Sequence, residues 1–453
     1  MAKVIVSHKQ CMINPHKMSQ SIGASMAFMG VDKSIPLLHG AQGCASFGLV
    51  LMGRHFREAV PILTTALDEV STVLGGFDNV EEAIVNIAGR TKPSLIGICT
   101  TGISEIKGDD LDGFLKLIRA KHPELEATML VGVSTPDFEG SYQDGWATAV
   151  TRIIEDLVEI PLLEKKPSRR INVLAGCHLT PGDIDELRDI FEAFSLEPIF
   201  LPDLSGSLDG HVAAEFTQTT LGGMSVAQIR SMGSACWTVA IGEQMRGAAI
   251  TLEHRTGVPY VLFDRLTGLA CNDELMTFLA RASGRPVPKK YRRQREQLID
   301  AMLDGHFHFG GKKVAIAAEP DLLSAVSHWL SEMGCEIHAA VTTTHSPVLE
   351  SIPADEVLLG DLEDLELRAV DADLIVASTY GRQSSERLGV PLFRIGLPVF
   401  DRLGSGHRVT VGYRGTRDLI FEIGNLFLTS LHELTPEMWM TNEHQPRMIS
   451  TVH

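Results

Sequence analysis

Short apolar runs that end in Gly, Thr, Ser or Pro recur along this chain, and stretches of helical periodicity separate them. Such runs are rich in Ile, Val and Leu without alternation, which is typical of parallel strands buried on both faces. The strand candidates are Leu95–Cys99, Thr128–Ser134, Ile171–Ala175, Pro198–Leu201, Pro259–Phe263, Lys313–Ala318, Glu336–Val341, Leu374–Ser378 and Leu392–Ile395. Between them, Asp321–Met333 has the spacing of an amphipathic helix that stops at Gly334. This alternation predicts an α/β fold with open, mainly parallel sheets.

The length of 453 residues suits several such units in one chain. The polar, basic stretch Glu164–Arg170 is a candidate linker, and a second boundary is expected near Asp304–Gly311, before the strand at Lys313. We therefore predict three α/β domains: 1–165, 166–305 and 306–453.

The charge balance excludes some classes of partner. Apolar residues make up 44% and charged residues 21%, as in an ordinary globular protein, and the formal net charge is −17. A surface of that charge repels nucleic acid and anionic membranes over most of its area. No apolar run approaches the ~20 residues that span a bilayer, and the N-terminal residues carry no secretory signal. We expect a cytoplasmic protein.

The seven cysteines are dispersed, and none forms a C-x-x-C pair. In a reducing compartment such residues are free thiols or metal ligands rather than disulfides. They are Cys11, Cys44, Cys99, Cys177, Cys236, Cys271 and Cys335.

Nucleotide and zinc motifs are missing. No strand candidate is followed by G-x-G-x-x-G, and H-E-x-x-H does not occur. Gly310–Lys313 resembles the end of a phosphate loop, but its other positions do not fit, so a turn into a strand is the better interpretation. His306 and His308 could reach one metal ion, although two neighbouring histidines in a linker are more often solvated.

Cys44 lies in the glycine-rich segment LHGAQGCASFGLVL, just before a predicted helix. A helix N-terminus stabilises a thiolate, and Gly40 and Gly43 would let the backbone approach a bulky inorganic cluster. The alternative is a small residue in a tight turn, and the segment alone leaves both open. An iron–sulfur cluster takes four protein ligands, so Cys44 would share it with distant residues or another chain.

The helix after Cys44 carries Arg54, His55 and Arg57. These charges either face an acidic partner or a negatively charged cluster, or they form a solvated, ion-paired surface.

Motifs along nearly the whole chain resemble the β-subunit family of nitrogenase component 1. Three resemble its cluster-binding segments: Asn14-Pro15-His16-Lys17 with Ser19-Gln20, then Leu38 to Cys44, then Thr100 to Glu105 with Gly108-Asp109-Asp110. The resemblance continues through Ser134-Thr135-Pro136, Gly140-Ser141, Ala282–Pro288, Ser378–Gly381 and Arg394–Arg402.

This chain differs from that family at two cluster-ligand positions, and these differences indicate which kind of member it resembles. The catalytic β subunit has a cysteine in each of the three segments, whereas this chain has Ser19 and Gly102 at two of these positions and keeps only Cys44. This pattern resembles the β-type subunit of the scaffold that assembles the iron–molybdenum cofactor. Cys99 is offset by three residues from the third ligand position, and we interpret it as a buried core thiol.

The resemblance implies three Rossmann-like domains and an α2β2 heterotetramer. It also implies a [4Fe–4S] cluster bound by Cys44 and by three cysteines of a NifE-like α-type partner. That partner would hold most of the transient cofactor precursor. The nitrogenase iron protein and a NifB-type cluster donor are the other implied partners, and no independent enzyme activity is expected.

Three alternatives remain. The B-type subunit of dark-operative protochlorophyllide reductase also shares a cluster, but a carboxylate ligand would be expected there. The equivalent scaffold of a vanadium system cannot be distinguished by these motifs. A plain nucleotide-binding α/β enzyme is disfavoured by the missing glycine fingerprints.

Overall fold

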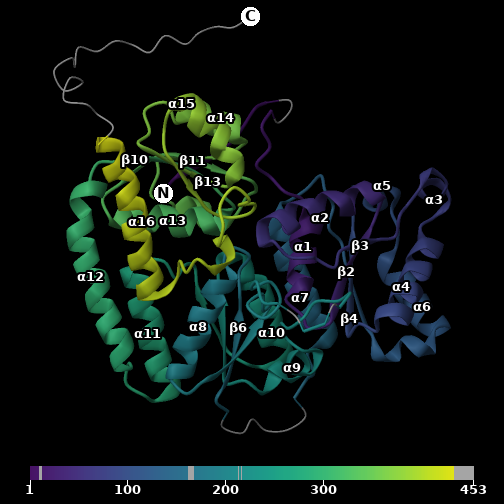
Figure 1. Cartoon of the computed structure of the whole chain (residues 1–453). Coiled ribbons are helices and arrows are strands. Elements are labelled where there is room, and N and C mark those ends of the chain that lie inside the picture. The colour runs from purple at the N-terminus through teal and green to yellow at the C-terminus, as the bar shows by residue number, and fades with distance from the viewer. Residues whose placement is uncertain (10–12, 162–167, 213, 216, 433–453) are drawn as a thin grey trace, which may run out of the picture.

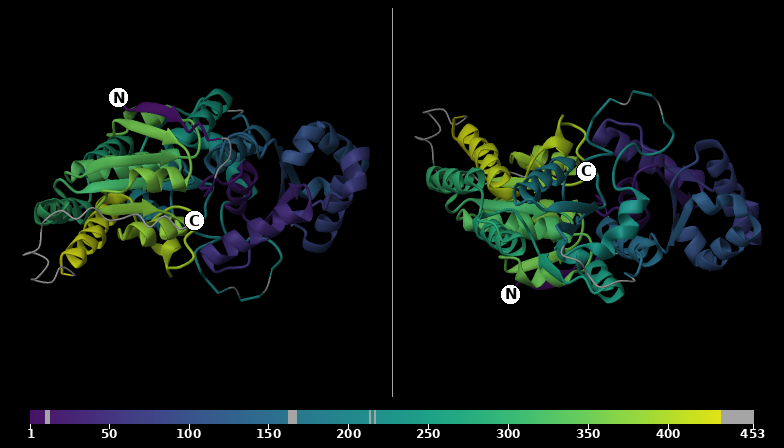
Figure 2. Two further views of the ribbon diagram at one scale, coloured as in Figure 1. Left: turned by 90° about the horizontal axis from the view of Figure 1, so that it is seen from above. Right: turned by 90° about the horizontal axis from the view of Figure 1, so that it is seen from below.

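The fold contains three parallel sheets flanked by helices (Figure 1). The computed structural model describes residues 1–9, 13–161, 168–212, 214–215 and 217–432. The predicted α/β class with mainly parallel sheets is confirmed. The first sheet and its helices lie to one side of the molecule, and the other two sheets lie together on the opposite side (Figures 1 and 2).

The first sheet has the order β3-β2-β4-β5. Its strands are β2 (Ser34–His39), β3 (Leu63–Thr64), β4 (Leu95–Thr100) and β5 (Met129–Val133). Its helices are α1 (Gln20–Met29), α2 (Gln42–Phe56), α3 (Glu69–Leu74), α4 (Phe77–Thr91), α5 (Gly102–Lys107), α6 (Leu111–Lys121), η1 (Pro123–Ala127) and α7 (Tyr142–Leu157). Because every pair is parallel, the loops after β2, β4 and β5 meet at one edge.

The second sheet has the order β7-β6-β8-β9, again all parallel. Its strands are β6 (Arg170–Leu174), β7 (Glu197–Leu201), β8 (Trp237–Ile241) and β9 (Tyr260–Phe263). The helices are α8 (Pro181–Ala193), α9 (Val226–Arg230), η2 (Ser231–Ser234), η3 (Glu243–Met245), α10 (Arg246–Thr256), α11 (Leu269–Ser283) and α12 (Lys289–Phe309).

The third sheet has the order β1-β12-β11-β10-β13-β14. Its strands are β1 (Lys3–Val6), β10 (Lys313–Ala317), β11 (Glu336–Thr342), β12 (Glu356–Leu359), β13 (Leu374–Ala377) and β14 (Leu392–Arg394). The helices are α13 (Pro320–Glu332), η4 (Pro347–Ser351), α14 (Leu362–Arg368), η5 (Thr379–Gly381), α15 (Arg382–Leu388), η6 (Ser405–His407) and α16 (Gly412–His432). The first strand of the chain therefore pairs with β12, far away in the sequence.

The predicted strands all occur, with each end within one residue of its predicted place, and α13 matches the predicted helix. The linker expected at Asp304–Gly311 is wrong, because α12 continues through it to Phe309. Most of the other linker lies outside the described residues, and Arg170 already begins β6. The division at 165 and 305 remains a prediction. Within the described ranges, no helix is both long and apolar enough to cross a membrane.

Two glycines let α1 and α7 pack almost backbone to backbone. A Cβ added at Gly145 would lie 1.9 Å from the carbonyl oxygen of Gln20, and one at Gly23 would lie 1.9 Å from that of Tyr142. The N-terminal ends of both helices are thereby held together. On the same helix, Trp146 donates its indole N–H to Ala175 O at 2.9 Å, which ties α7 to the end of β6.

Replacing Gly145 by Ala should lower the free energy of unfolding by about 2 kcal/mol or more, because the added methyl group overlaps a backbone carbonyl that cannot move away easily. Chemical denaturation followed by circular dichroism measures this. Gly89→Ala in α4 is the matched control, since a Cβ there meets nothing within 4 Å. The control should be neutral or stabilising by up to ~1 kcal/mol. Equal effects of both substitutions would contradict the close packing.

Glu319 joins elements of two sheets where the three sheets meet. Its Oε2 accepts hydrogen bonds from the hydroxyls of Ser141, at the start of α7, and Thr343, after β11, at 2.6 and 2.8 Å. Burial raises the pKa of Glu319 to about 7, and the nearby carboxylate of Asp144 adds to the rise. The same junction holds a mainly apolar cavity of about 100 Å³, lined by residues that include His55, Cys177 and Leu322.

The raised pKa of Glu319 makes the junction sensitive to pH. The folded chain takes up this proton as the pH falls through about 7, before the unfolded chain does. Protonation of Glu319 therefore adds to the free energy of unfolding below the pKa that this carboxyl has in the unfolded chain. This contribution is lost as the pH rises to about 7. Glu319→Gln removes this dependence, so its stability relative to wild type should rise between pH 4.5 and 7, by up to about 3 kcal/mol. Denaturation across this range measures the difference. The exposed Glu126→Gln should show none, and a pH-independent difference for Glu319→Gln would refute the assignment.

Candidate metal-ligand site around Cys44

The three segments that resemble cluster-binding segments converge at the N-termini of three helices. Ser19 is the N-cap of α1, Cys44 is the third residue of α2, and Gly102 is the first residue of α5. Asp137, in the loop after β5, links two of them. Its Oδ2 accepts the Gly102 N–H at 3.0 Å, and its Oδ1 accepts the Ser21 hydroxyl at 3.3 Å. The fold thus gathers the predicted site positions around one carboxylate.

Cys44 is half-buried in the first turn of α2, which begins at Gln42 rather than after the cysteine. The backbone N–H groups at the start of α2 lower the thiol pKa, as expected, but the net shift is upward. Burial raises the pKa of Cys44, the negative charge of Asp137 raises it further, and the backbone N–H groups offset only part of this. Removing a thiolate from water is costly unless a cation balances it. A metal ion supplies that charge and displaces the thiol proton.

The two glycines before Cys44 differ in what surrounds them. A Cβ at Gly40 would lie 2.5 Å from the Thr101 hydroxyl oxygen, so glycine is required for the close approach of the two turns. A Cβ at Gly43 would meet nothing within 4 Å. The backbone immediately before Cys44 is therefore open on the side where a bulky group could approach.

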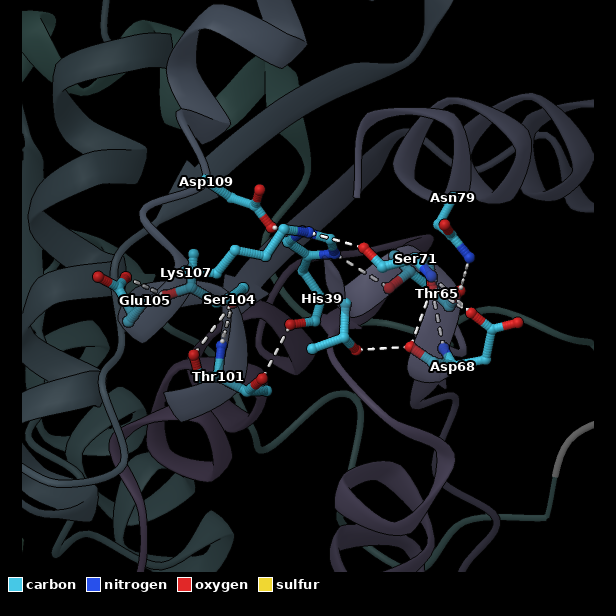
Figure 3. A network of polar contacts seen from close by, with 12 residues as sticks. His39, Thr65, Asp68, Ser71, Asn79, Thr101, Ser104, Glu105, Lys107 and Asp109 are labelled. Carbon is cyan, nitrogen blue, oxygen red and sulfur yellow. Dashed lines mark hydrogen bonds and ion pairs between the residues drawn. The ribbon is translucent and has the colours of Figure 1, made fainter. Parts of the chain in front are cut away.

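A buried polar network supports the turn that leads to Cys44 (Figure 3). His39, at the end of β2, contacts Asp109 Oδ2 through Nε2 at 3.1 Å and Thr65 Oγ1 through Nδ1 at 3.0 Å. Lys107 lies 3.2 Å from the same Asp109 oxygen and donates to Ser71 O. Burial lowers the pKa of His39. A neutral ring with its proton on Nε2 donates to Asp109 and accepts from Thr65.

Further hydrogen bonds connect this part of the fold to the backbone of the segment that leads to Cys44. Thr101 donates its hydroxyl to His39 O at 2.9 Å, and Thr64 donates to Gly40 O at 2.8 Å. The order hydroxyl–imidazole–carboxylate in Thr65, His39 and Asp109 resembles a hydrolytic triad. However, the Thr65 and His39 side chains are both buried, so the hydroxyl is not presented at the surface of the chain. The network therefore fixes the positions of loops.

The other cysteines lie elsewhere in the fold. Cys99 is fully buried in β4 and its pKa is raised to about 12 by burial, so the predicted core thiol is confirmed. Cys177, Cys271 and Cys335 are buried and Cys236 is half-buried, while Cys11 lies outside the described residues. In the part of the chain that the structure describes, no three His, Cys, Asp or Glu side chains form a group that could hold a metal ion.

Arg54, His55 and Arg57 attach α2 to the third sheet. The Arg54 guanidinium lies 4.0 Å from the Phe400 ring centroid, Arg57 donates to Phe400 O at 2.9 Å, and His55 Nδ1 accepts the Val399 N–H at 2.9 Å. They are about ten residues beyond Cys44, or about 15 Å along the helix. The solvated, ion-paired surface is therefore wrong as the full description, while contact of the exposed Arg54 and Arg57 with an acidic partner or a cluster stays a hypothesis.

The remaining candidates for metal or phosphate binding have structural roles. His306 and His308 lie in the last turn of α12, where His306 Nδ1 contacts Leu303 O. Gly310–Lys313 is the turn from α12 into β10, and Gly311 has a positive φ of 74°. The interpretation of this segment as a turn is confirmed.

Asp137 and the His39–Asp109 pair were not assigned a role from the sequence. A signal for Asp137 does exist, because it follows β5 and the carboxyl ends of parallel neighbours β4 and β5 meet at one edge. No comparable signal pairs His39 with Asp109, because their contact depends on how α5 ends after Lys107.

Comparison with known proteins places these features in a family. The profile described as nitrogenase component 1 type oxidoreductase matches residues 19–428. The nitrogenase iron-molybdenum cofactor biosynthesis protein NifN of Bradyrhizobium diazoefficiens is 56% identical over 99% of this chain and 97% of its own. The protein of the same name from Klebsiella pneumoniae is 39% identical over 96% of this chain and 95% of its own.

Solved structures of similar fold support the same family. One described as nitrogenase Cp1 at pH 6.5 has a TM-score of 0.90 and 32% identity, covering 96% of this chain and 97% of that chain. A second, described as nitrogenase Cp1 at pH 5, shares the fold with a TM-score of 0.68 at 15% identity. The chain belongs to the family of nitrogenase component 1 type oxidoreductases.

Proposed function

We propose that this chain is the β-type subunit of a scaffold for assembly of the iron–molybdenum cofactor of nitrogenase. In this proposal, Cys44 provides one thiolate to a [4Fe–4S] cluster whose other three ligands come from a NifE-like α-type partner. The names of its relatives support the assembly role. The observation that carries the cluster assignment is the convergence of the three segments with a single thiol among their ligand positions.

The chemistry of the site fits an iron–sulfur cluster. Iron in such clusters prefers thiolate sulfur, and Cys44 is the thiol at the converging helix N-termini. The open space at Gly43 lets backbone N–H groups approach the cluster sulfides. Ser19 could bind iron only as an alkoxide, and Gly102 has no side chain, so neither supports a second ligand in this chain.

Exposed apolar side chains on α2, α3 and α5 support the proposal of a partner protein. Phe47 follows Cys44 by one helical turn and is 57% exposed, and Val73 and Ile106 on α3 and α5 are each 80% exposed. Large apolar side chains that the chain alone leaves exposed favour a surface that another protein covers. An obligate interface would bury more than ~2,000 Å².

In this arrangement the residues of the chain bind the cluster and hold the surrounding turn and helix in place. Cys44 holds one corner of the cluster, which supplies electron transfer when bound. The His39 network keeps the preceding turn in place, and the Arg54 and Arg57 contacts anchor the far end of α2. An α2β2 assembly receives electrons from the iron protein and a precursor from a NifB-type donor, and the precursor sits mainly in the α-type partner. Without these partners the chain is expected to have no turnover.

Replacing Cys44 by Ala tests the ligand. Co-purified anaerobically with the α-type partner, Cys44→Ala should retain roughly half or less of the wild-type cluster, because an iron atom loses its thiolate and is exposed to solvent. Its electron paramagnetic resonance spectrum should change as well. Iron analysis and one spectrum per variant provide the measurement.

Cys236→Ala is the matched control, since Cys236 is also half-buried but lies far from the three segments, beside Arg170 at the start of the second sheet. It should leave iron content and spectrum unchanged. Full iron content with an unaltered spectrum in Cys44→Ala would contradict the ligand assignment. Metal analysis of the loaded complex separates a molybdenum from a vanadium system.

A further inference from the structure

The Asp137 carboxylate bonds to the first turns of both α1 and α5, two of the helices that begin around Cys44. It accepts the Gly102 N–H at the start of α5 and the Ser21 hydroxyl in the first turn of α1. Ser21 in turn contacts the Ser19 hydroxyl at 3.0 Å. The positions that lack a thiol are therefore held together through one side chain.

The Asp137 carboxylate lies beside the positions that lack a thiol. A Cβ added at Gly102 would lie 3.5 Å from its Oδ2, and its Oδ1 accepts the Ser21 hydroxyl. No Lys or Arg among the described residues forms an ion pair with Asp137, so its charge is not neutralised within this part of the chain. A partner that covers the site would remove water and strengthen the effect of this charge.

We propose that Asp137 positions the α1 and α5 segments around Cys44 and, through its negative charge, lowers the reduction potential of the cluster that Cys44 binds. The second part rests on the proposed function. We assign the carboxylate a positioning and electrostatic role, because its two oxygens accept hydrogen bonds from the Gly102 N–H and the Ser21 hydroxyl.

Reduction of the cluster adds one electron from an external reductant, with no bond formed or broken and no proton taken up. The added negative charge is repelled by a fixed carboxylate nearby, so the oxidised form is favoured. Asparagine removes the charge but keeps the bonding geometry. Its oxygen can accept the Gly102 N–H, and its amide can donate to the Ser21 hydroxyl oxygen.

The electrostatic part is tested by redox titration of the anaerobic complex, followed by electron paramagnetic resonance. Asp137→Asn should keep its iron and show a reduction potential shifted to more positive values. Glu82→Gln, which removes one exposed carboxylate from α4, should show a much smaller shift. An unshifted potential in Asp137→Asn overturns the proposal. Loss of iron with a changed spectrum also overturns it, because that result identifies Asp137 as a ligand.

The positioning part is tested on the chain without any cluster, so it does not depend on the proposed function. Asp137→Ala removes both hydrogen bonds. Hydrogen exchange should become faster at residues 19–29 and 102–107, while Glu82→Ala should leave these segments unchanged. Unaltered exchange in Asp137→Ala overturns the positioning role. A wild-type complex that holds no cluster would instead refute the proposed function, and this exchange result would still decide the role of Asp137.

Discussion

The parallel pairing of β2, β4 and β5 is the constraint on which the site depends. Parallel strands deliver all their carboxyl ends to the same edge of the sheet, so the turns that follow them must lie next to one another. Cys44, Gly102 and Asp137 each follow one of these strands. Ser19 joins them from outside the sheet, because the glycine contact between α1 and α7 brings the start of α1 to the loop that follows β5. Close backbone packing and sheet topology together bring four distant segments to one place.

Helix α2 connects this edge to the rest of the molecule. Its first turn carries Cys44, and its last turn is bonded to the loop before η6 through His55, Arg57 and the ring of Phe400. His55 also lines the cavity at the junction of the three sheets. A displacement of the third sheet would therefore move α2 along its length, and α2 carries the proposed ligand. The rigidity of the site depends on contacts about 15 Å from it as well as on the local network.

How much the sequence could predict differs between strands and side-chain contacts. Strands such as β6 and β13 are continuous apolar runs and were found, whereas β2 was missed because Pro36 interrupts its pattern, although Pro36 lies in a fully buried strand. Cys44 could be singled out as a candidate because its turn is rich in glycine and matches a family segment. The net upward shift of its pKa was not predicted, because burial and the charge of Asp137 depend on the folded environment. The linker placed at Asp304–Gly311 failed for a related reason: the polar residues of α12 form the exposed side of a helix that packs against α16.

The positions where the family's cysteines are missing are not simply vacant. Ser19 pairs with Ser21, and the backbone of Gly102 is bonded to Asp137, so both positions are connected to the chain by hydrogen bonds that a cysteine ligand would not need. Polar groups that lie near a buried interface require such partners, since leaving them unpaired costs about 1–3 kcal/mol each. Cys44 differs, because burial and the charge of Asp137 both favour its neutral, protonated thiol in the chain alone. Of the three positions, only that of Cys44 has a side chain that becomes a thiolate ligand when it gives up its proton, and in the proposed complex an iron atom would displace that proton.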